Sequence, residues 1–347
     1  MPNSSPAKLG YSMPAEWSPH EATWISWPHR DGISFPGCFD RVQPTLVKMA
    51  IAIAESEMLR INVRDAEHEA FVRKLLARAP AERIEYHCIP TNEPWCRDHG
   101  PIFVTKKQAP RLAMIDFGYN AWGWKYPPFD DDDAVPGNIA GALGIKHFDY
   151  SHFVLEGGSI DLNGAGALIT TEACLLNPNR NPELNRAEIE ELLKESLGVK
   201  KIIWLGDGIE GDDTDGHVDD MTRFVGPSTV VTAIEEDESD PNYYLLEENY
   251  SRLEAVQLAK DEPLEILKLP MPSRIVRDGQ RLPASYANFY IANEAVLLPV
   301  FGETNDAWAE SVLRGVFPKR KIVSIDCREL IWGLGAFHCL TQQQPAV

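Results

Sequence analysis

The sequence predicts an α/β fold in a single domain over residues 1–347. Patterns of amphipathic helix alternate with short apolar strands along the chain, and similar polar turns recur beside those strands. Hydrophobic residues make up 44% and charged residues 24% of the composition, as in ordinary globular proteins. No linker-like stretch divides the chain, and no apolar run approaches the roughly 20 residues that span a bilayer. We therefore expect one domain with no membrane partner.

Five segments carry helical patterns. Apolar residues at three- and four-residue spacing predict helices over 42–57 and 66–79. Asn185 and Glu188 form a capping-box pattern that begins a helix ending at residue 197, before Gly198. The segment 243–260 is the longest helical pattern, and Asp306 is expected to cap a helix to residue 317.

Short apolar runs bounded by turn residues predict strands over 167–171, 218–225, 229–234, 295–300 and 322–325. Polar turns recur at Trp27, Asp98, Glu156, His217, Asn288 and Cys339, at intervals of 71, 58, 61, 71 and 51 residues. A diverged strand-turn-helix repeat around an axis would bring these turns together at one end. An ordinary α/β domain would show similar spacing, so the intervals alone leave both architectures open.

The charge and the cysteines restrict the partners and the compartment. A net charge of -19 disfavours nucleic acid and anionic membranes, and it permits a small cationic substrate. Residues 1–10 are polar and lack the features of a secretory signal, so we expect a cytoplasmic protein whose six cysteines are reduced. No zinc-binding spacing occurs, and adjacent His338 and Cys339 suit one tetrahedral metal poorly. We expect neither metal nor cofactor, and a homo-oligomer is left open.

The C-terminal segment 333–345 holds a candidate nucleophile, Cys339. Two glycines, a His-Cys pair and three glutamines occur in this short stretch, whereas chain ends usually fray. The glycines permit a positive φ or a close approach of the backbone to a neighbour.

Acidic and basic partners for Cys339 occur in three turns. His217 and Asp219 would share one face of an extended strand, and an imidazole beside a carboxylate suits acid–base chemistry. Asp98 lies in a turn before the apolar run 102–104, and Glu156 precedes two glycines. Each of these residues, taken alone, equally suits a structural role as a buried histidine or a turn-capping acid.

Together these segments resemble a known family. The motifs that carry the resemblance are Met13-Pro-Ala-Glu-Trp-Ser-Pro-His20 with Thr23-Trp24, Arg97-Asp-His-Gly-Pro101, Asn120-Ala-Trp-Gly123, Glu156-Gly-Gly158, Thr214-Asp-Gly-His-Val-Asp219 and His338-Cys-Leu-Thr-Gln-Gln-Gln-Pro345. They are similar, in order over almost the whole chain, to the agmatine deiminases and the bacterial peptidylarginine deiminases. This resemblance implies a five-bladed α/β propeller, the pentein fold, with a site at its axis. By motif, the implied catalytic residues are Asp98, Glu156, His217, Asp219 and Cys339.

The resemblance also implies a mechanism. Asp98 and Asp219 would hold a guanidinium through charge-assisted hydrogen bonds while Cys339 attacks its central carbon and His217 transfers protons. Glu156 would orient His217. The three carboxylates predict that Cys339 is mostly thiol in the free protein and ionises as substrate binds.

The remaining substrate contacts are less specific. Trp95 and Trp122 would bind the substrate cation, although core aromatics are the alternative for each. The distal ammonium of the substrate needs an acceptor, for which Asp215 is the candidate among Asp212, Asp213 and Asp215; solvated loop acids are the alternative.

The expected reaction is hydrolysis of agmatine to N-carbamoylputrescine and ammonia, a step of putrescine and polyamine metabolism. The family typically carries Gly-Gly-Gly-Asn-Ile-His-Cys before its final glutamines, whereas Leu334, Ala336 and Phe337 occur in the corresponding stretch here. This difference leaves arginine, peptidylarginine or another guanidino substrate open. Further alternatives are an amidinotransferase, a cysteine amidase and a non-catalytic guanidine-binding protein. An amidase would need an oxyanion hole of donors, while this site is rich in carboxylates.

Overall fold

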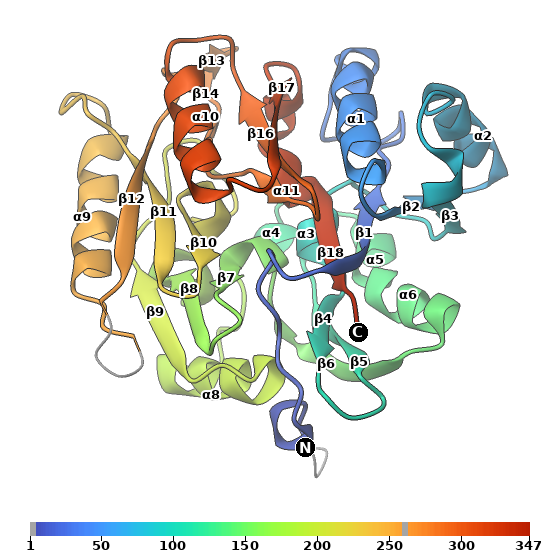
Figure 1. Cartoon of the computed structure of the whole chain (residues 1–347), viewed down its shortest axis with the longest axis horizontal. Helices are drawn as coiled ribbons and strands as arrows, with labels where there is room; N and C mark the ends of the chain where they lie inside the picture. The colour runs from blue at the N-terminus through green and yellow to red at the C-terminus, as the bar shows by residue number, and fades with distance from the viewer. Residues whose placement is uncertain (1–4, 259–262) are drawn as a thin grey trace.

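The computed structural model describes residues 5–258 and 263–347, which form five sheets arranged in a ring (Figure 1). Each of the five sheets has three or four strands. A separate two-stranded hairpin joins β13 (Val276–Arg277) to β14 (Gln280–Arg281). The predicted five-bladed α/β propeller is confirmed.

All five blades repeat one order of pairing. The first strand of a blade pairs antiparallel with the second, and the second pairs parallel with the third. The blades are, in order, β18 (Thr341–Pro345), β1 (His20–Ser26), β2 (Met58–Val63) and β3 (Ile84–Cys88); β4 (Ile102–Thr105), β5 (Leu112–Gly118) and β6 (Lys146–Val154); β7 (Ile160–Leu162), β8 (Ala167–Thr171) and β9 (Lys201–Leu205); β10 (Thr222–Gly226), β11 (Thr229–Ile234) and β12 (Glu265–Pro270); and β15 (Tyr290–Ile291), β16 (Ala295–Val300) and β17 (Lys321–Asp326).

Helices connect the parallel strands, because such a connection must cross back over the sheet. The connecting helices lie toward the rim of the ring in Figure 1: α1 (Phe39–Ala54), α2 (Ala66–Leu75), α6 (Val135–Leu143), α8 (Arg186–Leu197), α9 (Asn242–Glu254) and α10 (Asn305–Val316). Shorter helices are α3 (Cys96–His99), α4 (Ala121–Trp124), α5 (Asp130–Asp133), α7 (Glu172–Leu175) and α11 (Phe337–Leu340). Single 3-10 turns occur at Ala7–Leu9, Ala81–Arg83, Gly157–Ser159, Val218–Asp220 and Leu330–Gly333.

Most predicted elements are present, and the differences have local causes. The capping box that opens α8 is confirmed, with Asn185 and Glu188 bonded reciprocally to backbone N–H groups. Asp306 does not cap α10, because its carboxylate accepts bonds from the N–H groups of residues 301–303 in the preceding turn, and Thr304 is the cap residue. Helix α9 ends at Glu254, before the predicted end, and residue 260 lies outside the described residues.

The predicted strand over 218–225 was wrong in its first half. Residues Val218–Asp220 form a 3-10 turn, and the strand begins at Thr222. Neighbouring side chains of a strand point to opposite faces. Here Asp219 and Asp220 are both buried beside Cys339, within 4.8 Å of one another, and a tight turn allows that.

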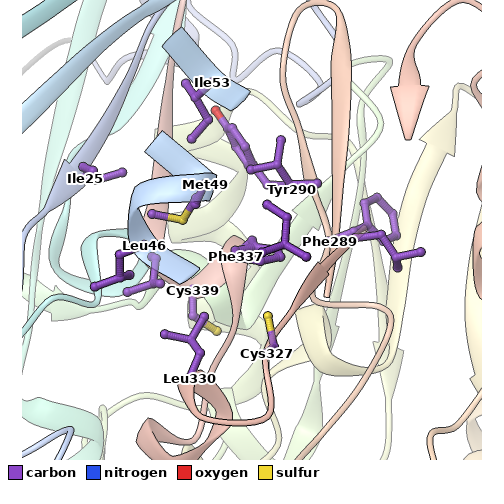
Figure 2. Packing of buried hydrophobic residues seen from close by; sticks show 14 of the residues in the cluster. Ile25, Leu46, Met49, Ile53, Phe289, Tyr290, Cys327, Leu330, Phe337 and Cys339 are labelled. Atoms are coloured by element: carbon purple, nitrogen blue, oxygen red, sulfur yellow. The ribbon is translucent and has the colours of Figure 1, made fainter. Parts of the chain in front are cut away.

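The largest hydrophobic cluster supports the C-terminal segment. Phe337 is fully buried in this cluster, among residues of α1, blade 1 and the last blade such as Met49, Ile25 and Tyr290 (Figure 2). Cys339 belongs to the same cluster. Within residues 5–258 and 263–347, no helix is both long enough and apolar enough to cross a membrane.

Candidate active site

Cys339 lies on α11, where two glycines permit a close approach. Gly335 lies against Trp95: a Cβ added there would fall 2.7 Å from the indole Cζ3 and 3.2 Å from the Cys339 sulfur. Gly333 contacts Phe35 and Trp95 as closely. A side chain at either position would displace the indole from the thiol, so the close approach predicted for these glycines is confirmed.

Asn288 holds the backbone and the sulfur of the nucleophile segment. Its Oδ1 accepts from the N–H groups of Ala336, His338 and Cys339 at 3.1, 3.1 and 3.3 Å. Its Nδ2 donates to the Cys339 Sγ at 3.0 Å and to Asp220 Oδ1 at 3.0 Å. We did not predict Asn288 as a site residue, although its turn was part of the quasi-repeat.

Asp98 and Asp219 lie on different sides of the site. Asp98 accepts from the Trp122 indole at 3.0 Å and from the Gly158 N–H at 2.9 Å. The Cys339 Sγ lies 3.6 Å from Asp219 Oδ2, while the buried Asp219 Oδ1 has no hydrogen-bond partner among the described residues.

His217 lies between Asp98 and Glu156. Its Nδ1 is 3.7 Å from Asp98 Oδ1, and a Cβ added to Gly158 would fall 2.6 Å from that nitrogen. The position after Glu156-Gly157 must therefore be glycine for the imidazole to lie there. Neither ring nitrogen of His217 makes a hydrogen bond within the described part of the chain.

Glu156 makes an ion pair with Arg180, whose Nε donates to Glu156 Oε1 at 2.5 Å. Its second oxygen is buried and has no partner among the described residues. Arg180 also donates to Asp215 Oδ2 at 2.8 Å and to the Thr214 carbonyl, so it links Glu156 to the loop that carries His217.

The buried charges set the protonation states of the site. Burial raises the pKa of the Cys339 thiol well above its usual range, and Asp219, Asp220 and Asp98 raise it further. Burial alone would lower the pKa of His217, but Asp98 raises it well above the usual value. At neutral pH the site therefore holds Cys339 as a thiol beside a protonated His217. The raised pKa of Cys339 agrees with the direction expected from the sequence.

The pKa values of Asp98 and Asp219 are shifted in opposite directions. Burial raises the pKa of Asp98 to about 6 in spite of the opposing charge of His217. Burial would also raise the pKa of Asp219, but the hydrogen bond and charge of His338 lower it below its usual value. Both groups are therefore anionic at neutral pH.

A cavity of about 200 Å³ opens onto Cys339 and Asp98. Trp95 and Trp122 line it beside these two residues. Asp219, His217 and Glu156 are fully buried and do not line the cavity. Other residues that line it include Ile33, Glu93, Tyr126, Asp213, Trp332 and Leu334. The volume is below the range of typical drug-sized sites, which favours a small ligand.

The aspartates of the 212–215 loop differ in position. Asp215 does not line the cavity, because its carboxylate is paired with Lys125 and Arg180. Asp212 accepts from the N–H groups of Gly216 and His217. Only Asp213 of the three lines the cavity, where it accepts from the Tyr126 hydroxyl. Ala336 and Phe337 also lie away from the cavity, so Leu334 alone of the three unusual residues faces it.

Among the described residues, two groups of side chains have ligand atoms close enough to hold a metal ion. One is Glu156, Cys174 and His217, and the other is Asp219, Asp220 and Cys339; within each group the atoms lie within 4.8 Å of one another. All six side chains are buried. The same groups suit proton transfer and cation binding.

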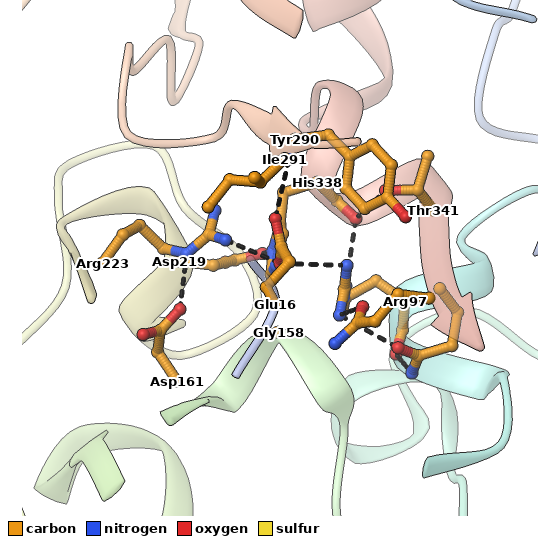
Figure 3. A network of polar contacts seen from close by, with 12 residues as sticks. Glu16, Arg97, Gly158, Asp161, Asp219, Arg223, Tyr290, Ile291, His338 and Thr341 are labelled. Atoms are coloured by element: carbon orange, nitrogen blue, oxygen red, sulfur yellow. Dashed lines mark hydrogen bonds and ion pairs between the residues drawn. The ribbon is translucent and has the colours of Figure 1, made fainter. Parts of the chain in front are cut away.

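A second layer of charged residues was missed from the sequence. Figure 3 shows Glu16, Arg97, Asp161, Arg223 and His338 joined into one buried network beside Asp219. Charged residues are rarely this buried unless they are paired. Part of the signal was present in the sequence, because Glu16, Arg97 and His338 lie inside the motifs that carry the family resemblance.

A sequence model of the Porphyromonas-type peptidyl-arginine deiminases matches residues 12–345. The chain belongs to this family. Agmatine deiminase of Ectopseudomonas mendocina (strain ymp) is 38% identical, over 99% of this chain and 98% of that protein.

Solved structures of similar proteins agree with this membership of the Porphyromonas-type peptidyl-arginine deiminase family. Agmatine deiminase of Enterococcus faecalis superposes with a TM-score of 0.92 at 34% identity, covering 99% of this chain and 98% of that one. A C. jejuni agmatine deiminase with substrate bound gives a TM-score of 0.87 at 32% identity, covering 96% of each chain.

Proposed function

We propose that this protein is an agmatine deiminase that hydrolyses agmatine to N-carbamoylputrescine and ammonia. The observation that carries the proposal is the cysteine at the base of a small cavity, surrounded by two buried carboxylates and an imidazole. The names of the full-length relatives and of the similar solved structures support it. A carboxylate-rich site favours a cationic substrate over a neutral amide.

The guanidinium binds over the Cys339 sulfur. Asp98 and Asp219 accept its N–H groups from two sides, and the unpaired Asp219 Oδ1 is available for one of them. Trp95 and Trp122 pack against the planar cation. The added positive charge lowers the pKa of the Cys339 thiol, which releases its proton to water as the substrate binds.

Cys339 acts as the nucleophile in the first half of the reaction. Its thiolate forms a bond to the central guanidinium carbon, while protonated His217 gives its proton to the departing nitrogen. The C–N bond breaks, ammonia leaves, and an S-alkylthiouronium remains on Cys339.

Water completes the reaction. Neutral His217 takes a proton from water, and the hydroxide adds to the same carbon. The C–S bond then breaks with loss of the hydroxyl proton to sulfur, which releases the ureido product and restores the thiol and the protonated His217. Glu156, held by Arg180 and with a carboxylate oxygen within 4.8 Å of an imidazole nitrogen, is the group proposed to orient His217.

The acidic lining of the cavity favours agmatine over arginine. Besides Asp98, two carboxylates line it, from Glu93 and Asp213. Glu93 accepts from the N–H groups of Ile33 and Ser34, which fixes its position at the cavity wall. A distal ammonium is attracted to these acids, whereas the α-carboxylate of arginine is repelled. We therefore assign the ammonium contact to Asp213 and Glu93 in place of Asp215.

The test is to incubate the purified protein with agmatine, arginine and an arginine-containing peptide, and to measure ammonia and ureido product. We expect product from agmatine, with Cys339→Ser losing turnover and keeping agmatine binding by calorimetry. Product from arginine or the peptide alone would contradict the assigned substrate but retain the mechanism. Ammonia production by Cys339→Ser would contradict the covalent mechanism.

We propose that residues 1–347 form one catalytic domain and that the protein is cytoplasmic. Limited proteolysis with unfolding monitored by two probes would test the first, since one domain unfolds in a single coincident transition.

A further inference from the structure

His338 bridges two buried carboxylates behind the site. Its Nδ1 lies 2.6 Å from Asp219 Oδ2, and its Nε2 lies 2.8 Å from Glu16 Oε2 (Figure 3). The three side chains are 2%, 0% and 7% exposed for His338, Asp219 and Glu16, so water does not compete for these bonds. Neither His338 nor Glu16 lines the cavity.

The bridge demands two donors from one imidazole. Ionised carboxylate oxygens only accept hydrogen bonds, and a neutral imidazole donates from one nitrogen only. The two short contacts are both satisfied when both nitrogens of His338 carry a proton. The ring therefore lies between two carboxylates, with one nitrogen facing each of them.

Glu16 is itself held in place by several elements. Arg223 of β10 donates to its Oε2 at 2.7 Å, Arg97 of α3 lies 3.5 Å from the same oxygen, and the N–H of Ile291 donates to Oε1 at 2.9 Å. Burial would raise the pKa of Glu16, but Arg223, His338 and Arg97 hold it well below its usual range. Asp161 in turn pairs with Arg223 at 2.6 Å. Glu16 is therefore a rigid, charged anchor.

We propose that His338 is a positioning residue for the deiminase reaction: anchored by Glu16, it fixes one oxygen of Asp219 and so aims the other at the substrate guanidinium. The free oxygen is Oδ1, which is buried and unpaired among the described residues. His338 touches no substrate in this scheme and acts only through Asp219. This inference rests on the proposed function and extends it to a residue outside the cavity.

Two matched substitutions separate the halves of the bridge. In His338→Asn the amide nitrogen takes the place of Nδ1, so the bond to Asp219 is kept and the bond to Glu16 is lost. In His338→Gln the amide nitrogen takes the place of Nε2, so the bond to Glu16 is kept and Asp219 is released. Both variants replace the same ring with a neutral amide, which makes each the control for the other.

The experiment measures kcat and KM for agmatine in both variants, together with a crystal structure of each. We expect kcat/KM of His338→Gln to fall roughly 10- to 100-fold, by analogy with residues that orient metal ligands, with a raised KM and a lowered kcat. His338→Asn, which keeps the bond to Asp219 but loses the anchor at Glu16, should lose less of kcat/KM than His338→Gln. The Asp219 carboxylate should be displaced in the Gln structure and unmoved in the Asn structure.

The crystal structures of the two variants test the positioning role of His338 whatever the substrate is. If Asp219 keeps its position in His338→Gln, the positioning role is overturned, whatever the activity. Equal loss of kcat/KM in the two variants overturns it as well. If the unchanged protein does not turn over agmatine, the proposed function fails, while a displaced Asp219 in the Gln structure alone still supports the bridge.

Discussion

The pKa of Asp98 determines the pH below which the site binds its substrate weakly. Its pKa, raised to about 6 by burial, lies within the range where a deiminase can be assayed. Only the anionic form binds the guanidinium strongly, so Asp98 protonation weakens binding below about pH 6. We predict that kcat/KM falls with decreasing pH through this value. In the substrate complex the bound cation lowers the pKa of Asp98, and kcat should fall at a lower pH than kcat/KM.

Trp122 supplies the control for this prediction. Its indole N–H donates to Asp98 and lowers the pKa of that carboxyl. Trp122→Phe removes the donor, so the acidic fall of kcat/KM should move to higher pH. Rate profiles from about pH 4.5 to 9 measure both effects; an unmoved profile in Trp122→Phe would show that another group controls the acidic fall.

At the residue scale, the sequence predicted the candidate catalytic residues but few of their contacts. The structure brings Cys339, Asp98, Glu156, His217 and Asp219 together, although their roles stay predictions. Asn288 was missed because a lone asparagine in a turn gives no sign that it accepts from three backbone N–H groups 48 to 51 positions away. Asp215 was assigned to the substrate because a sequence does not show which cation pairs with a given carboxylate. In the structure its partners are Lys125 and Arg180.

At the scale of single elements, the segment that carries Cys339 contains a backbone conformation unusual for its residue. Leu334 has φ 69°, in the left-handed region, where the Cβ of an L-residue crowds the following carbonyl at about 1–2 kcal/mol. Its side chain lines the cavity. The family's usual glycine at this point would avoid the strain.

A pair of substitutions isolates this backbone cost. Leu334→Ala and Leu334→Gly lose nearly the same side-chain contacts, but only glycine relieves the strain. We predict that Leu334→Gly has a free energy of unfolding about 0.5–1 kcal/mol above that of Leu334→Ala, measured by urea denaturation. At exposed Glu191 in α8 the order should reverse, with Ala more stable than Gly by about 1 kcal/mol. If the Ala variant is more stable than the Gly variant at position 334 as well, strain at Leu334 is ruled out.

Elements with strong local signals were predictable, and those built by long-range contacts were not. The capping box of α8 and the apolar stripes of α1 and α2 determine those helices locally. The 3-10 turn at Val218–Asp220 follows instead from partners on α11 and near β15, which a periodicity analysis does not include. The strand prediction failed there because the site, and not the local sequence, determines the backbone.

At the scale of the whole molecule, blade 1 is made from both ends of the described chain. Strand β18 pairs antiparallel with β1, and the two lie side by side in Figure 1. The three glutamines of β18 are buried because they accept from other elements: Gln342 and Gln343 from Arg97, and Gln344 from the Trp24 indole. The contacts of Gln342 and Gln343 join blade 1 to α3.

We predict that deleting residues 341–347 prevents cooperative folding. The deletion exposes the edge of β1 and removes two acceptors of the buried Arg97 guanidinium, which favours aggregation. Deleting only the exposed residues Ala346 and Val347 should leave the melting transition nearly unchanged. Calorimetry and size-exclusion chromatography on both proteins would measure this, and a monomeric protein that melts sharply after the longer deletion would contradict it.

Ring closure by β18 also has a consequence for biosynthesis. Both carboxylates and the imidazole are translated more than a hundred residues before Cys339, and the strand that locks the nucleophile in place follows it. Chains emerge from the ribosome at roughly 5–20 residues per second, so the earlier blades exist for several seconds without a reactive thiol beside them. A chain released in that interval has no nucleophile, because Cys339 has not yet been added.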